Sequence, residues 1–126
     1  MTTAFTRVAL IGRFQTPSVG ASIRDIAAFL GGRGIEVLLD QNTAASIGEG
    51  HWRVLDTEQI GHQANLAVAV GGDGTMLGVA RMLAPFGVPV VGINHGRLGF
   101  ITDIALANWR QALGTILDGQ FHSEER

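Results

Sequence analysis

The sequence predicts an α/β fold of three layers, in which a mainly parallel β-sheet is covered by helices on both faces. Two observations predict it: short apolar runs rich in β-branched residues, and intervening stretches whose apolar positions repeat at helical spacing. Strands that are apolar along their whole length need cover on both faces, which crossover helices of a parallel sheet provide. The 126 residues suffice for one such domain with its own core.

The first half of the chain predicts a β-α-β unit. The helix is predicted because Ile23, Ile26 and Leu30 recur at the spacing of one helix face, and Gly31 with Gly32 is expected to end it. In chain order, we expect a strand at 7–12, a loop at 12–20, a helix at 21–30, a strand at 35–40, a loop at 41–50 with one helical turn at 44–47, and an unassigned short element at 52–59.

The second half continues the alternation and contains two glycine-rich segments. In chain order, we expect a strand at 65–70, a helix at 75–84, a strand at 88–93 and a helix at 105–117. The glycine-rich segments, 71–75 and 94–100, each follow a predicted strand directly. Both are therefore expected at the carboxyl edge of the sheet, where open parallel sheets bind their ligands.

Composition excludes several classes of function. The chain has no Cys, which removes thiol nucleophiles and cysteine zinc sites. Its nine basic residues are all Arg, are scattered along the chain and leave a net charge of −2, so we expect no nucleic-acid partner. No apolar stretch approaches the length of a membrane span, and the first residues lack the pattern of a signal peptide. We therefore expect a cytoplasmic protein without a membrane partner.

The segment at 71–75, with the sequence GGDGT, is the strongest candidate for chemistry. Gly71, Gly72 and Gly74 let the backbone approach a ligand closely and adopt positive φ, and the helix that follows favours a phosphate at its N-terminus. A chain without lysine has no Walker A loop. The dinucleotide fingerprint is also unmet, because Leu77 stands where its third glycine is required.

Asp73 is unusual in a loop of the phosphate-binding type, because a carboxylate repels phosphate. Its presence makes sense if it accepts a proton from an attacking hydroxyl. The structural alternative is that Asp73 or Thr75 only caps the following helix. In the second segment, Asn94 has an alternative role in supporting the turn, and Phe100 is either a core residue or a platform for a base.

The amino-acid sequences of two segments resemble those of the NAD kinase family. Residues 65–77 read NLAVAVGGDGTML, and residues 88–103 read VPVVGINHGRLGFITD. The GGDGT motif is shared with diacylglycerol kinases, sphingosine kinases and, in looser form, phosphofructokinases. The second motif is much more specific to NAD kinases. The resemblance implies a Rossmann-like domain, namely the N-terminal domain of the NAD kinase fold.

The resemblance also implies an activity and roles for individual residues. The family transfers the γ-phosphoryl group of ATP, or in some members of inorganic polyphosphate, to the adenosine ribose 2′-hydroxyl of NAD, giving NADP, with Mg²⁺ present. Asp73 would accept the proton and Gly74 would line the NAD site. Leu98 and Phe100 would pack against adenine. The cofactor-binding set implied is Gly71, Gly72, Gly74, Thr75, Asn94, Leu98 and Phe100, with no protein ligand to a metal.

Two departures from the family pattern qualify this expectation. Several members have a basic residue five positions after the aspartate, where this chain has Gly78. The family's enzymes also have a second, β-rich domain that supplies an Asn-Glu pair. We expect residues 1–119 to form the N-terminal domain and residues 120–126 to begin the strand leading to that second domain. The chain alone should then have little activity, and the full-length protein is expected to be a homo-oligomer.

Two other functions stay open at this point. A lipid kinase of the diacylglycerol or sphingosine type would share Asp73 and its loop but has no reason to contain the GRLGF sequence. The other is a non-catalytic α/β module that binds a nucleotide or has only a structural role, and such a module would need no catalytic acid.

Overall fold

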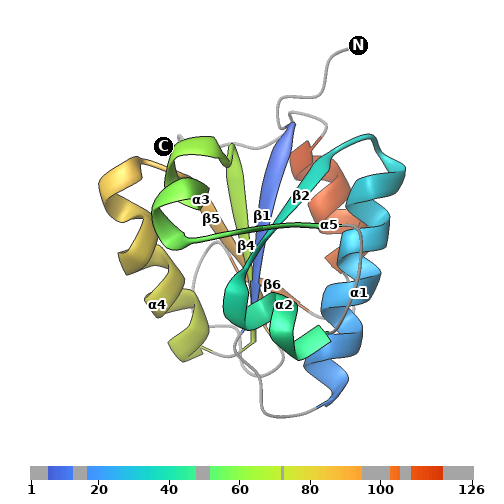
Figure 1. Ribbon diagram of the computed structural model, residues 1–126. Coiled ribbons are helices and arrows are strands. Elements are labelled where there is room, and N and C mark those ends of the chain that lie inside the picture. Colours follow the sequence, from blue (N-terminus) through green and yellow to red (C-terminus); the bar gives the residue numbers. More distant parts are fainter. Residues whose placement is uncertain are drawn as a thin grey trace.

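The computed structural model describes residues 6–12, 17–47, 52–71, 73–94, 103–105 and 109–117. Six strands form one sheet in the order β3-β2-β1-β4-β5-β6, and each neighbouring pair is parallel. Helices lie on both sides of the sheet, with α3 and α4 on one side and α1 and α5 on the other (Figure 1). The predicted three-layer α/β fold with a parallel sheet is confirmed.

The elements follow one another in strict alternation until the 3-10 helix η1. They are β1 (Arg7–Gly12), α1 (Pro17–Gly32), β2 (Glu36–Asp40), α2 (Gln41–Ile47), β3 (Arg53–Leu55), α3 (Thr57–Gln63), β4 (Leu66–Gly71), α4 (Asp73–Leu83), η1 (Ala84–Phe86), β5 (Val90–Asn94), β6 (Asp103–Ala105) and α5 (Trp109–Thr115).

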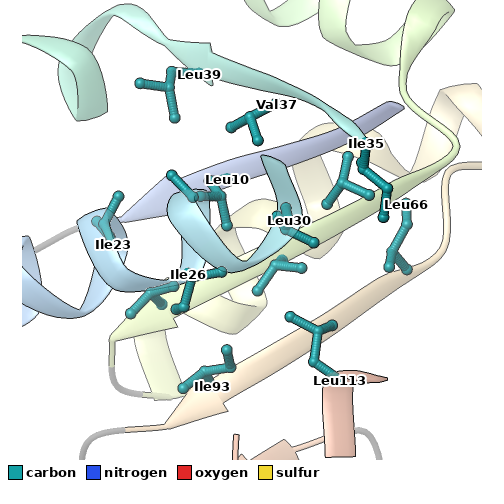
Figure 2. Packing of buried hydrophobic residues seen from close by; sticks show 14 of the residues in the cluster. Leu10, Ile23, Ile26, Leu30, Ile35, Val37, Leu39, Leu66, Ile93 and Leu113 are labelled. Atoms are coloured by element: carbon teal, nitrogen blue, oxygen red, sulfur yellow. The ribbon is translucent and has the colours of Figure 1, made fainter. Parts of the chain in front are cut away.

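The central strands bury alternate residues in two cores, one on each face of the sheet. In β1, Val8 and Leu10 belong to the core beneath α1 and α5, whereas Ala9 and Ile11 belong to the core beneath α3 and α4. Figure 2 shows the first of these cores, where Leu10 lies among residues of α1, the neighbouring strands and α5. This double burial explains why the strands read as continuous apolar runs in the sequence.

Helix α1 starts earlier and ends later than the sequence predicts. It begins at Pro17, inside the expected loop, because proline suits the first helical position, where its missing N–H costs nothing. It passes through Gly31 and Gly32 and ends in a Schellman motif at Gly34, whose φ is +79°. The amide of Gly34 donates to Gly31 O at 3.0 Å and that of Ile35 to Leu30 O at 3.1 Å.

Three further expectations were wrong or incomplete. In the expected loop at 41–50, the predicted helical turn at 44–47 is the second half of a longer helix, α2. The unassigned stretch at 52–59 contains β3 and the start of α3. A capping box begins α3, since Asp56 Oδ1 accepts from the Gln59 amide at 2.8 Å and Gln59 Oε1 accepts from the Asp56 amide at 3.0 Å. Ala105 ends β6 instead of beginning a helix.

Asn65 ties the starts of β1 and β4 together at the amino edge of the sheet. Its Oδ1 accepts hydrogen bonds from the Thr6 amide at 2.9 Å, the Thr6 hydroxyl at 2.8 Å and the Arg7 amide at 2.8 Å. The Asn65 amide in turn donates to Arg7 O at 2.8 Å. These bonds anchor the beginning of β1 at the edge opposite the glycine-rich segments.

Gly61 brings α3 close to η1, the 3-10 helix that follows α4. A Cβ atom at Gly61 would lie 2.3 Å from Cγ of Phe86. We expect Gly61→Ala to lower the free energy of unfolding by about 1–3 kcal/mol, because the ring must move. Chemical denaturation measures the change. Gly78→Ala is the matched control, since that helical glycine is exposed with open space around it and should gain roughly 0.5–1 kcal/mol. Equal stabilities of the two variants would contradict the packing argument.

Candidate active site

The sheet order places a topological switch point between β1 and β4. From β1 the chain proceeds outward through β2 and β3, and from β4 it proceeds the other way through β5 and β6. Connections that leave the carboxyl ends of β1 and β4 in opposite directions open a crevice, which is where doubly wound sheets bind ligands. Gly12 ends β1 and Gly71 ends β4, so these two residues flank the candidate site.

The structure brings several predicted site residues to this edge. Gly71 is buried at the end of β4, and Asn94 ends β5 as its Cα partner across the ladder. Asp73, Gly74 and Thr75 are the first three residues of α4. The other three members of the predicted site, Gly72, Leu98 and Phe100, lie outside the described residues.

Gly71 has the positive φ that the sequence analysis expects of the glycines in this segment. Its φ of +149° lies in a region that only glycine adopts readily, so the turn out of β4 needs glycine at this position. Gly74, by contrast, is helical as the second residue of α4, so positive φ is not the reason for glycine there. One of the three loop glycines thus has a clear conformational reason in the structure.

The structure bears on the capping alternative for both polar residues. Asp73 and Thr75 are the first and third residues of α4, so neither is the residue that precedes the helix, where a capping side chain stands. A carboxylate at the first helical position still stabilises the helix dipole, so a helix-stabilising role for Asp73 is the alternative to the catalytic one.

The sequence did not indicate Thr43, which lies at the same edge. Its side chain is fully buried and extends from α2 to the last residue of β1. The Thr43 hydroxyl accepts from the Gly12 amide at 3.0 Å and donates to Gly12 O at 3.4 Å. The Thr43 amide donates to Asp40 Oδ1 at 3.2 Å, which makes Asp40 the cap of α2. An aspartate, which is a preferred capping residue, directly before the helix was the available signal for this helix start.

No metal centre is formed within the described residues, where no three acidic or histidine side chains gather. A polar hollow of about 170 Å³ lies beyond the ends of β2 and β3 and is lined in part by Asp40 and Asp56. Both carboxylates cap helices, those of α2 and α3 respectively. Their use as caps gives these two acids, of which Asp40 is buried and Asp56 is exposed, a structural role at the edge of the sheet.

Comparison with known proteins decides the family. Residues 8–121 match the protein family described as the ATP-NAD kinase N-terminal domain. The chain belongs to the NAD kinase family. The resemblance carried by residues 65–77 and 88–103 is thereby confirmed, and the match also covers β1, α1 and β2, where the sequence resemblance is weak.

Individual NAD kinases are close to this chain in sequence. It is 50% identical over 126 residues to the NAD kinase of Polaromonas naphthalenivorans, covering all of this chain and 43% of that protein. It is 53% identical over 122 residues to the NAD kinase of Bordetella avium, covering 97% of this chain and 41% of that protein. The chain therefore spans about two fifths of the length of these NAD kinases.

A solved structure supports the fold assignment. The crystal structure of yeast NADH kinase complexed with NADH matches with a TM-score of 0.76 over 89% of this chain and 36% of that chain, at 20% sequence identity. The similarity shows that this chain has the fold of the matched part of that protein. Among the described helices, none has the length and apolar character needed to cross a membrane.

Gly78, at the position where the family resemblance leads us to expect a basic residue, lies on the exposed surface of α4, five residues after Asp73. A Cβ at this position would have no atom within 4 Å. The backbone there has room for a side chain. Packing therefore does not explain why this chain has glycine at position 78 instead of a basic residue.

Proposed function

We propose that this chain is the catalytic N-terminal part of an NAD kinase, which transfers the γ-phosphoryl group of ATP to the adenosine ribose 2′-hydroxyl of NAD. The observation that carries the proposal is the position of Asp73: it opens α4 immediately beyond β4, at the switch point, in a chain of the NAD kinase family. An acid at this place can meet a hydroxyl and a phosphate that both bind in the crevice.

The transfer is an in-line displacement at phosphorus. The 2′-oxygen of NAD forms a bond to the γ-phosphorus while the bond from that phosphorus to the β,γ-bridging oxygen breaks, and ADP leaves with the electron pair. The proton of the 2′-hydroxyl moves to the carboxylate of Asp73, which is the general base. Inorganic polyphosphate can replace ATP in the same scheme, since its terminal phosphoryl group is bound to a comparable leaving group.

The remaining residues of the site would bind and orient the substrates. Gly71, Gly72 and Thr75 would shape the segment that meets the phosphates, and Asn94 would contribute to the cofactor site from the end of β5. Gly74, Leu98 and Phe100 contact the adenosine part of NAD. Mg²⁺ would be held through the phosphates of ATP, as is common for this ion, and would offset their charge.

The proposal extends to the organisation of the whole enzyme. Residues 1–119 would form the N-terminal domain, and residues 120–126 would lead into a β-rich domain that completes the dinucleotide pocket. The chain's coverage of 43% of the Polaromonas naphthalenivorans enzyme supports this division. Alone, the chain would contribute half of the cleft and turn over little substrate. The full-length enzyme would be a cytoplasmic homo-oligomer.

Formation of NADP from NAD, ATP and Mg²⁺ tests the proposed function. The full-length enzyme that contains this chain should form NADP, and the chain alone should form little or none. Diacylglycerol offered in parallel should not be phosphorylated, because the lipid kinase is the competing enzyme. Full activity of the chain alone would contradict the half-site proposal. Calorimetric titration that detects no binding of NAD or ATP to the full-length protein would favour a structural module.

A further inference from the structure

We infer that Thr43 is a positioning residue for phosphoryl transfer: its buried hydroxyl holds the Gly12 peptide at the end of β1 and so shapes the side of the crevice that receives the phosphoryl donor. The inference rests on the proposed function and deepens it. It concerns a residue that belongs to neither glycine-rich segment and that lies in helix α2, of which the sequence predicts only one turn, at 44–47.

The contact between Thr43 and Gly12 joins residues that are 31 positions apart in the chain. One hydroxyl bonds both polar groups of Gly12, accepting from its amide at 3.0 Å and donating to its carbonyl at 3.4 Å. Thr43 is fully buried, so water does not replace these bonds while the helix is in place. The hydroxyl therefore sets the orientation of Gly12 at the point where β1 ends.

Helix α2 holds this hydroxyl firmly because both of its ends are attached. At its start, Asp40 Oδ1 accepts from the Thr43 amide at 3.2 Å. At its end, the Arg24 guanidinium on α1 donates to the carbonyl of Ile47, whose side chain is buried in the core beneath α1. A helix fixed at both ends transmits its position to β1 through Thr43.

Topology indicates which substrate lies beside Gly12. Gly12 pairs through its Cα with Val70, the residue before Gly71, so β1 directly borders the segment that contains Asp73. On the opposite side of β4 lies β5, after which come Leu98 and Phe100, the residues proposed to contact NAD. With NAD on the β5 side and the proton acceptor after β4, the phosphoryl donor must occupy the β1 side. Thr43 should therefore affect ATP more than NAD.

Steady-state kinetics of the full-length enzyme test the inference with three variants. Thr43→Val keeps the shape but removes both bonds, and it should raise the KM for ATP by about five- to tenfold while the KM for NAD stays within about twofold. Thr43→Ser keeps the hydroxyl and should restore the wild-type KM for ATP. Asn65→Ala is the matched control, because it also removes bonds to the β1 backbone, but at the amino edge. It should lower the unfolding midpoint without changing either KM.

Several results would overturn the inference. If Thr43→Val changes only the unfolding midpoint, as Asn65→Ala does, then Thr43 is merely structural. A rise in the KM for NAD instead of the KM for ATP would indicate that NAD, and not the phosphoryl donor, binds beside β1. If Thr43→Val does not fold, Thr43→Cys replaces it, and its weaker thiol bonds should give a KM for ATP above that of Thr43→Ser; equal values would contradict the inference. An inactive wild-type enzyme would refute the proposed function itself, whereas an active one with unaffected variants refutes only the role of Thr43.

Discussion

Replacing Asp73 with Asn in the full-length enzyme should lower kcat for NADP formation by about 10²–10⁴-fold. The amide has almost the shape of the carboxylate but cannot take the proton of the ribose hydroxyl, so the attacking oxygen is no longer activated. Substrate contacts made by the rest of the site should persist, and the KM values for NAD and ATP should change much less than kcat. Initial rates at varied concentrations of both substrates separate the two effects.

The position of Asp73 in the first turn of α4 requires a control for stability. Loss of its interaction with the helix dipole is expected to cost about 0.3–1 kcal/mol, which an unfolding curve measures separately from the rate. Asp56→Asn is a suitable companion, because asparagine caps a helix as well as aspartate does, and Asp56 caps α3. That variant should keep its kcat. A kcat of Asp73→Asn within about threefold of wild type would leave Asp73 as a helix-stabilising residue only.

The sheet could be predicted from the sequence because burial on both faces leaves a local signature. Leu66 to Val70 are all buried, alternating between the two cores, and this produces the uninterrupted apolar run that predicts β4. The position of that run directly before GGDGT fixed the expected location of the candidate site. The family comparison confirmed the family resemblance that this segment carries, and the strand order places the end of β4 at the switch point. The roles of the residues in the segment stay predictions.

Helix boundaries were less predictable because they depend on capping and on contacts that are distant in sequence. The Gly31-Gly32 pair is the obvious stop signal for α1, yet the left-handed residue that ends it is Gly34, selected by the bonds to Leu30 and Gly31. Helix α2 has no apolar period to reveal it. Its stability comes from the cap at Asp40 and from the burial of Ile47.

The role of Thr43 could not be predicted for the same reason. In the sequence it is a polar residue in a stretch without periodicity, which is typical of an exposed loop. Only the packing of α2 against the end of β1 buries its hydroxyl and directs it to Gly12. Residues that support an active site from a neighbouring element leave no local pattern, so sequence analysis finds the glycine-rich segments and misses their support.

Replacing Gly71 with Ala should lower both stability and kcat. Its φ of +149° is strained for any residue with a Cβ, so the free energy of unfolding should fall by about 1–3 kcal/mol. Relief of that strain would turn the chain away from its path between β4 and α4. Because Asp73 begins α4 two residues later, we expect kcat per folded molecule to fall at least about tenfold, since small displacements of a catalytic group are costly.

Gly34→Ala is the control that separates the effect of backbone strain from the effect of moving Asp73. Gly34 also has positive φ, at +79°, and a Cβ there would touch nothing within 4 Å, so its substitution introduces backbone strain alone. It ends α1 just before β2 starts, at the amino edge of the sheet, away from the candidate site. We expect this variant to lose about 1–2 kcal/mol of stability and to keep its kcat. Denaturation curves and initial rates on both variants provide the comparison. If Gly71→Ala also kept its kcat per folded molecule, the turn at the end of β4 would serve folding only, and the geometry of Asp73 would have to be set from another part of the enzyme.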